Sequence, residues 1–261
     1  MTTPVAGILA RIVEEKQLEL QQSAVTRATL ENRAADRVAN RRDFAAALRA
    51  KKIAIISEIK KASPSKGLLC ADFHPAEIAL DYAAGGAAAL SILTDRKFFQ
   101  GSLADLESAR AAVQLPVLRK DFTTSEYHVV EAAAHGADAI LLIAAVLSAA
   151  KMRTLRELAA QYRMAALVEV HDDEELKSAI ASGAEIIGVN NRNLHTFEVT
   201  LETSLRLAKE IPASTLRISE SGFESRAQID TLRAAGYQAF LIGEHLMKAP
   251  SPREALLALT S

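Results

Sequence analysis

Short apolar runs that end in a charged or amide side chain recur along this chain. The side chains are Glu58 and Lys60, Lys120, Glu169, Asn190 and Glu220, at the carboxyl ends of runs 53–60, 116–120, 165–170, 185–190 and 215–220. A strand buried on both faces reads as a near-continuous apolar run, so an ionisable group at its end costs desolvation free energy unless it is paired or functional. In a (β/α)8 barrel, the carboxyl ends of all strands meet at one rim, where the active site lies. The pattern therefore predicts the fold and the place of the site together.

Strand and helix patterns alternate from residue 53 onward. The predicted strands are 53–59, 87–93, 116–120, 138–143, 165–170, 185–190, 215–220 and 238–242. Segments rich in Ala, Leu and Glu predict helices at 74–84, 102–112, 125–135, 148–162, 172–181, 200–210, 224–235 and 251–259. Eight such units favour a closed parallel barrel over an open sheet. We therefore predict an α/β fold, a (β/α)8 TIM barrel that spans residues 51–261.

Glycines at regular positions support this reading. Gly85-Gly86, Gly136, Gly183 and Gly236 come just before the second, fourth, sixth and eighth predicted strands. A glycine in the left-handed conformation is a common helix terminator, so we expect these residues to end the preceding helices.

Residues 1–50 form a separate N-terminal segment. Two groups of apolar residues in it follow helical spacing: Val5, Ile8, Leu9 and Ile12, and then Phe44, Ala47 and Leu48. Asp43 stands where it can cap the second helix. The stretch between the two groups is polar and rich in Arg and Asn. We predict a helical extension that packs on the barrel, so that the chain is a single domain overall.

Composition excludes several classes of partner. The formal net charge of −1 provides no field to attract nucleic acid or an anionic membrane. Trp is absent, Cys70 is the only cysteine, and no apolar run approaches the ~18 residues of a membrane span. No secretory signal pattern opens the sequence. We expect a cytoplasmic, monomeric enzyme whose partner is a small molecule, with neither nucleic acid nor membrane involved.

Cofactor motifs are also missing from the sequence. None of the six histidines pairs with another at metal-ligand spacing, and no GxxxxGK[ST] or strand-linked GxGxxG occurs. We therefore expect no metal and no nucleotide cofactor.

Three sets of strand-end residues are candidates for chemistry. Glu58 and Lys60 share one face of a strand end, either as a functional pair or as a structural ion pair at the barrel mouth. Lys120 is either a proton donor with a lowered pKa or an exposed lysine. Glu169 and Glu220 can take different acid and base roles if their surroundings separate their pKa values, or either one can anchor a lysine.

Two glycine-containing loops are candidates for binding phosphate. Ser221-Gly222 follows the seventh predicted strand, and Gly243-Glu244 follows the eighth. In many barrels these two loops bind phosphate through backbone N–H groups, which Gly allows to approach closely. The alternative is ordinary turn formation.

A family resemblance rests on eight segments. They are SEIKKASPSKG (57–67), SILTDRKFFQGS (91–102), LRKDF (118–122), ADAILLIAAVL (137–147), LVEVH (167–171), GVNNRNL (188–194), ISESG (218–222) and AFLIGEHLM (239–247). Together they resemble the indole-3-glycerol-phosphate synthase family over nearly the whole chain, the N-terminal extension included. The first and sixth segments are the most specific.

The resemblance implies a reaction of tryptophan biosynthesis. The substrate is 1-(2-carboxyphenylamino)-1-deoxyribulose 5-phosphate, and the products are indole-3-glycerol phosphate, CO2 and water, with no cofactor. By resemblance, Lys120 is the general acid of ring closure and Glu169 the base or partner acid of dehydration. Lys60 contacts the anionic groups of the substrate, while three further residues orient or stabilise intermediates: Glu58, Asn190 and Glu220.

The resemblance also implies which residues bind the substrate. The phosphate positions are Ser221, Gly222, Gly243 and Glu244, the aromatic pocket is lined by Phe99, Phe122, Leu141 and Leu194, and the polar rim consists of Ser63, Ser65 and Arg192. An inward carboxylate at Glu244 would repel phosphate, so we expect that side chain to point away. The alternatives are another sugar-phosphate barrel, such as the neighbouring pathway isomerase or the α-subunit of tryptophan synthase, and a non-catalytic binding barrel. Residues 1–50 and segment 57–67 argue against the other enzymes, and the presence of both Lys120 and Glu169 argues against the non-catalytic barrel.

Overall fold

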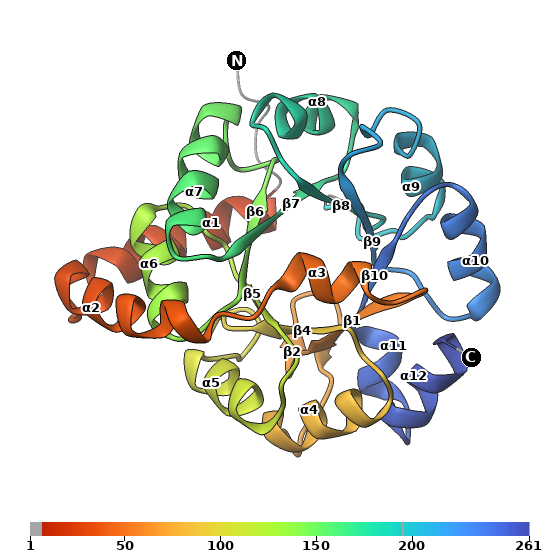
Figure 1. Ribbon diagram of the computed structural model, residues 1–261, viewed down its shortest axis with the longest axis horizontal. Helices are drawn as coiled ribbons and strands as arrows, with labels where there is room; N and C mark the ends of the chain where they lie inside the picture. Colours follow the sequence, from red (N-terminus) through yellow and green to blue (C-terminus); the bar gives the residue numbers. More distant parts are fainter. Residues whose placement is uncertain (1–6, 195, 261) are drawn as a thin grey trace.

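The computed structural model describes residues 7–194 and 196–260 (Figure 1). Within these ranges, eight parallel strands pair edge to edge and close into a barrel. Around the barrel they are β1 (Ala54–Ile59), β4 (Ala89–Leu93), β5 (Val117–Lys120), β6 (Ala139–Ile143), β7 (Ala165–Val170), β8 (Ile186–Asn190), β9 (Leu216–Glu220) and β10 (Ala239–Ile242), which pairs with β1 again. The predicted (β/α)8 TIM barrel is confirmed, and every predicted strand is found within two residues of its expected ends.

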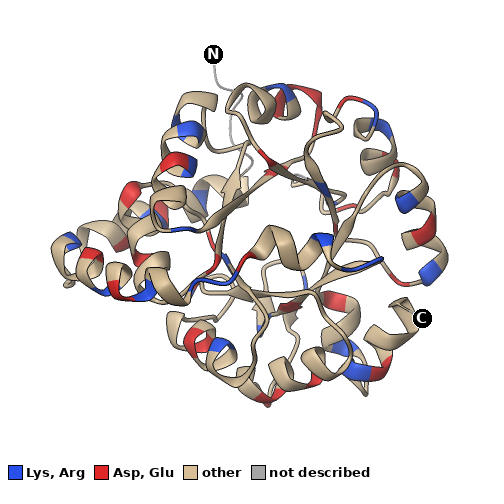
Figure 2. Cartoon of the chain, viewed as in Figure 1, with Lys and Arg blue, Asp and Glu red and all other residues tan. Residues whose placement is uncertain are grey.

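Helices cover the outside of the barrel. They are α4 (Pro75–Ala84), α5 (Leu103–Ala112), α6 (Glu126–Ala134), α7 (Ala149–Gln161), α8 (Asp173–Ala181), α9 (Glu202–Leu207), α10 (Arg226–Ala234) and α12 (Pro252–Thr260). Local chemistry fixes where several begin, because a Ser or Asp side chain at the N-cap accepts a hydrogen bond from the first turn of α5, α6, α7, α8 and α10. Charged side chains of both signs are interspersed over these helices (Figure 2).

The predicted helix-ending glycines behave as expected. Gly86, Gly136, Gly183 and Gly236 all have positive φ, whereas Gly85 is right-handed helical. Two small elements were not predicted. One is the hairpin of β2 (Ala62–Ser63) and β3 (Gly67–Leu68), and the other is the short helix α11 (Glu244–Lys248).

The core consists of two apolar layers, one inside the barrel and one between the barrel and its helices. Successive strand residues point to opposite faces, so the side chain two positions beyond an inward residue also points inward. Inward apolar residues of the four charged strands are Ile56, Leu118, Leu167 and Ile218. Two residues beyond each, in the same order, come Glu58, Lys120, Glu169 and Glu220. The register of the strands therefore aims all four charges at the barrel axis.

The N-terminal extension is helical and contacts the barrel at several places. It contains α1 (Gly7–Gln21), α2 (Arg27–Arg37), the 3-10 turn η1 (Val38–Asn40) and α3 (Phe44–Arg49). Helix α2 packs on α6, and its buried residues are Leu30 and Ala34. The sequence did not predict this helix, because the segment is mostly polar. The predicted residue Val5 lies outside the described residues.

Helix α3 covers the amino-terminal end of the barrel and lies across its centre in Figure 1. As predicted, Asp43 caps it, accepting a hydrogen bond of 2.9 Å from the backbone N–H of Ala46. Its buried Phe44 and Leu48 belong to the same apolar cluster as the inward strand residues. The segment before α3 is tied to the barrel by Arg42, whose guanidinium donates to the carbonyl oxygen of Leu115 at 2.6 Å.

Substitution of Phe44 by Ala should destabilise the fold without touching the chemistry. Phe44 is 1% exposed, and removing such a ring costs about 3–5 kcal/mol of unfolding free energy. Urea denaturation measures the loss, and Leu257→Ala on the exposed side of α12 is the matched control, expected to change stability little. A loss below about 1 kcal/mol for Phe44→Ala would mean that α3 is not part of the core.

Candidate active site

The carboxyl ends of the strands open into a cavity of about 880 Å³. All the site residues predicted from the sequence line it: Glu58, Lys60, Ser63, Ser65, Phe99, Lys120, Phe122, Leu141, Glu169, Asn190, Arg192, Leu194, Glu220, Ser221, Gly222, Gly243 and Glu244. The structure thus brings together residues from all parts of the barrel, as expected for strand-end positions of one rim.

A cluster of buried charges lies at the bottom of the cavity. The Nζ of Lys120 on β5 is 2.7 Å from Oε2 of Glu169 on β7 and 3.5 Å from Oε2 of Glu220 on β9. Beside it, Lys60 forms an ion pair with Glu58 at the end of β1. The three glutamates are each no more than 5% exposed. One ammonium therefore bridges the buried carboxyl groups of two strands, β7 and β9.

The pKa of Lys120 shifts in the direction opposite to the one predicted. Burial by itself would lower the pKa of Lys120. The carboxylates of Glu169, Glu220 and Glu58 outweigh burial and raise that pKa above its ordinary value. The predicted lowering is therefore wrong for the free protein, because the lysine has carboxylate neighbours where cations or an apolar pocket were expected. Lys120 is therefore charged at neutral pH.

The same cluster separates the pKa values of the two carboxyls. Burial raises the pKa of Glu220 to about 8, with Glu169 and Glu58 acting in the same direction and Lys120 opposing. Burial also opposes ionisation of Glu169, but Lys120 and His171 outweigh it and lower the pKa of Glu169. At neutral pH, Glu169 is therefore an anion and Glu220 is mostly a neutral acid. This is the difference in acidity that acid and base roles require.

Two glycines make room for the carboxylates. A Cβ at Gly188 in β8 would collide with Oε1 of Glu220, and a Cβ at Gly243 would collide with Oε1 of Glu58. The sequence reading missed the role of Gly188 and assigned Gly243 to phosphate alone. A glycine inside an apolar strand run signals close approach of another group, and that signal was present in run 185–190.

The two loops predicted to bind phosphate lie side by side at the cavity wall. Ser221 and Gly222 have φ of 69° and 89°, and this left-handed pair turns the chain sharply after β9. β10 ends next to β9, and Gly243 follows it as the N-cap residue of α11. The N–H of Ser221 donates to the carbonyl oxygen of Leu241 at 3.4 Å, so the candidates for binding an anion are the N–H groups that follow it in these turns.

Glu244 does not turn away from the cavity as expected. Its carboxylate lies among cavity-lining cations, 2.7 Å from Nζ of Lys248, 3.5 Å from Nζ of Lys66 and 3.4 Å from a guanidinium nitrogen of Arg192. These cations compensate its charge, so a carboxylate here does not leave the mouth of the cavity negative.

The other side of the cavity is apolar. The rings of Phe99 and Phe122 lie with centroids 6.2 Å apart and a tilt of 37°. Helix α1 contributes Ile8, Leu9 and Ile12 to the lining. The helical spacing had identified these three residues as a packing face, but nothing in the sequence showed that the face covers the site.

The described residues contain neither a metal-binding cluster nor a membrane-spanning helix. Across residues 7–194 and 196–260, no group of three or more His, Cys, Asp and Glu side chains is arranged to hold a metal ion. No helix in the described part of the chain is long and apolar enough to cross a membrane.

Comparison with known proteins identifies the family. The family model described as indole-3-glycerol phosphate synthase matches residues 9–259. The chain belongs to this family. The indole-3-glycerol phosphate synthase of Chromobacterium violaceum is 50% identical over 97% of this chain and 98% of its own length, and that of Aromatoleum aromaticum is 48% identical over 97% and 99%.

Solved structures with other activities share the barrel. A thiamine phosphate pyrophosphorylase from Pyrococcus furiosus superposes with a TM-score of 0.59 at 16% identity, covering 81% of this chain and 95% of its own. An N-acetylmannosamine-6-phosphate 2-epimerase from Clostridium perfringens gives 0.58 at 15% identity, covering 74% and 86%. At these identities the likeness concerns the fold alone.

The raised pKa of Glu220 predicts a pH dependence of stability. Between about 4.5 and 8 the folded state binds a proton that the unfolded state has released, so wild-type stability falls as pH rises through this window. Glu220→Gln cannot ionise. Relative to wild type it should therefore gain up to about 1.4 kcal/mol of unfolding free energy per pH unit in that window.

Urea denaturation at several pH values between 5 and 8 provides the measurement for Glu220→Gln. Glu157→Gln, at an exposed position of α7, is the matched control and should run parallel to wild type. Parallel curves for Glu220→Gln and wild type would show that Glu220 is already ionised in the folded protein.

Proposed function

We propose that this chain closes the indole ring of indole-3-glycerol phosphate, with Lys120 as the general acid. The family reaction is that of a carbon–carbon lyase in tryptophan biosynthesis. The ring carbon bearing the carboxylate attacks the ribulose carbonyl carbon, and the carbonyl oxygen takes up a proton. CO2 then leaves, and loss of the new hydroxyl as water completes the indole. The chain therefore needs one acid for closure and an acid–base pair for dehydration.

The position of Lys120 carries this proposal. Its ammonium lies in the cavity at the junction of three carboxylates, where it is charged, desolvated and fixed in direction. When oxyanion character develops on the substrate carbonyl, the ammonium is the strong donor at hand. Protonation there neutralises the oxyanion and leaves Lys120 as a neutral amine. Before the transfer, the neighbouring carboxylates stabilise the positive charge of the ammonium.

The carboxyl groups suit the dehydration step. Glu169, ionised by its contacts with Lys120 and His171, is the base that removes a proton, and it can return that proton to the departing hydroxyl. Glu220, largely neutral, donates a hydrogen bond to intermediates. Asn190 pairs with Glu220 in the strand register and orients the same groups. Lys60, held by Glu58, attracts the substrate carboxylate.

Substrate binding divides between the two sides of the cavity. The backbone at Gly222 and Gly243, with Ser221 beside them, takes the phosphate, and the cations around Glu244 compensate the charge of its carboxylate. The aromatic ring lies against Phe99 and Phe122, with further contacts from Leu141 and Leu194. Ser63, Ser65 and Arg192 form the polar rim.

We also propose that the protein works as a monomer in the cytoplasm, on a phosphorylated small molecule, as one domain in which residues 1–50 pack on the barrel. Its single cysteine, Cys70, is free, which fits a reducing compartment. Light scattering coupled to gel filtration measures the mass directly, and a mass of twice 28.1 kDa would contradict the monomer.

Removal of the acid tests the central assignment. Lys120→Met keeps the apolar stem and removes the proton donor, so turnover should fall on the order of 10²-fold or more while phosphate still binds. Indole fluorescence reports product without a tryptophan background, because the protein has no Trp. Lys209→Met, at an exposed position, is the control and should retain full turnover. Near-wild-type turnover of Lys120→Met would exclude Lys120 as the acid.

Glu169→Gln should fail at a later step. Ring closure and CO2 release proceed, but dehydration stalls because the base is gone, so a decarboxylated, undehydrated intermediate should accumulate. Rapid-quench analysis within the first turnover detects it, and Lys120→Met should not form it. Accumulation of unreacted substrate in Glu169→Gln would place Glu169 in ring closure instead.

A further inference from the structure

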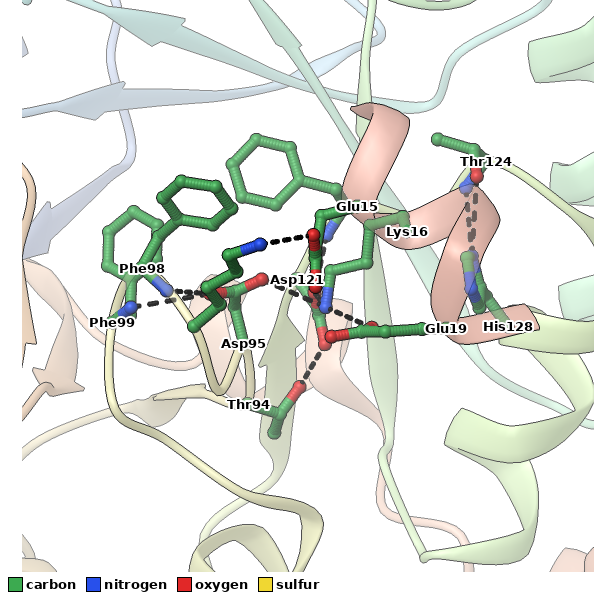
Figure 3. A network of polar contacts seen from close by, with 12 residues as sticks. Glu15, Lys16, Glu19, Thr94, Asp95, Phe98, Phe99, Asp121, Thr124 and His128 are labelled. Atoms are coloured by element: carbon green, nitrogen blue, oxygen red, sulfur yellow. Dashed lines mark hydrogen bonds and ion pairs between the residues drawn. The ribbon is translucent and has the colours of Figure 1, made fainter. Parts of the chain in front are cut away.

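A lysine on the N-terminal extension is buried beside the active site. Lys16 on α1 is 3% exposed, and its ammonium lies 2.9 Å from Asp95, 3.0 Å from Asp121 and 2.9 Å from Glu19 (Figure 3). Burial alone would lower the pKa of Lys16, but Asp121 and Asp95 outweigh it and raise that pKa above its ordinary value. The ammonium is therefore charged, and it joins the extension to two separate loops of the barrel.

Each aspartate that Lys16 contacts also organises a loop of the cavity. Asp95 accepts hydrogen bonds from the backbone N–H groups of Phe98 and Phe99, at 2.7 and 3.3 Å, and so shapes the turn that carries Phe99. The carbonyl of Phe99 in turn accepts from the N–H of Ala62, in the loop that follows Lys60.

Asp121 organises the segment that follows β5, the strand next to β4. It comes directly after Lys120 and accepts a hydrogen bond of 2.8 Å from the N–H of Phe122. Its other oxygen accepts from Thr94 at 2.6 Å and pairs with Arg119 at 3.1 Å. The ammonium of Lys16 thus lies between the segment that carries Phe99 and the segment that carries Lys120 and Phe122.

The two aspartates depend on Lys16 to different degrees. Asp121 retains Arg119 as a second cation. Oδ2 of Asp95 is buried and lies 2.9 Å from Nζ of Lys16, and among the described residues no other cation forms an ion pair with Asp95. Leu9, Ile12 and Lys16 are the buried residues of α1, at spacings that place them on one helix face. The same face that covers the cavity therefore ends in the ion pair.

We propose that Lys16 is a positioning residue for the reaction. It fixes α1 over the substrate cavity and sets the relative positions of the Phe99 turn and the Lys120–Phe122 segment. It touches neither substrate nor reacting atoms; it acts through Asp95 and Asp121. The inference rests on the roles proposed above for Lys120 and the aromatic pocket. Wild-type activity and the Lys120→Met variant test the proposed function and the role of Lys120, and the variants below test only the effect of Lys16.

Lys16→Met in the full chain is the first test. It keeps the buried apolar stem and removes the charge, so α1 should lose its ion pairs with Asp95 and Asp121. KM should rise about tenfold and kcat should fall several-fold, since small displacements of positioned groups cost large factors in rate. Backbone amides of α1 should exchange hydrogen faster, with no change in the barrel strands. Lys97→Met is the matched control, because its ammonium pairs with Glu15 of the same helix at an exposed site. It should keep both constants within twofold of wild type.

A second pair of variants separates positioning from charge compensation. Asp95→Asn retains an oxygen that can accept from Phe98 and Phe99 and removes the charge that Lys16 compensates. In Lys16→Met/Asp95→Asn, thermal stability should recover relative to Lys16→Met, while KM should stay raised because the tie to α1 is still absent. Recovery of both quantities would overturn the proposal, leaving Lys16 a mere counter-charge. A wild-type KM in Lys16→Met would overturn it as well.

Asp95→Asn alone decides the matter if the Lys16 variants do not fold. It leaves Lys16 paired with Asp121 and Glu19, so the protein contains no uncompensated buried charge. Under the proposal its KM rises several-fold and α1 exchanges faster. An unchanged KM and unchanged exchange would refute the positioning role.

Discussion

The ammonium of Lys120 is shared between carboxylates that β7 and β9 bring to within 3.5 Å of it. Burying three glutamates at the mouth of a barrel without a cation would cost several kcal/mol for each ion. With the ammonium present, the pKa of Glu169 is lowered and that of Glu220 stays raised. The same cluster therefore balances charge and separates the pKa values of the two carboxyl groups. Gly188 and Gly243 fit this arrangement, since a Cβ at either position would force Glu220 or Glu58 to shift.

The strands and the place of the site could be read from the sequence because both depend on local pattern. A buried strand must be apolar along its length, and the alternation of faces then carries Glu58, Lys120, Glu169 and Glu220 inward. Membership of a family with known chemistry supplied the candidate roles, including those of binding residues such as Leu194 that no local pattern distinguishes.

Other features depended on partners far away in the sequence. The direction of the Lys120 pKa shift is set by residues of β1, β7 and β9, none of which is its neighbour in the chain. No local pattern distinguishes Lys16, because its partners Asp95 and Asp121 lie far along the chain. Helix α2 has a polar sequence with only Leu30 and Ala34 buried, so its docking on α6 gave too weak a periodicity to detect.

The extension reaches both ends of the barrel, and this has a consequence for synthesis of the protein. Its contacts lie far along the chain: Glu15 meets Lys97 after 82 residues, Arg41 meets Tyr162 after 121, and Phe44 shares a cluster with Leu241 of the last strand. Contacts at such separation form slowly, and domains assemble as units once their chain is available. During translation the extension is made before the barrel, so α1 can complete its ion pairs only after Asp95 and Asp121 are made, and α3 can complete its apolar cluster only after β10. The earliest stage of synthesis at which these contacts can form therefore differs for α1 and α3.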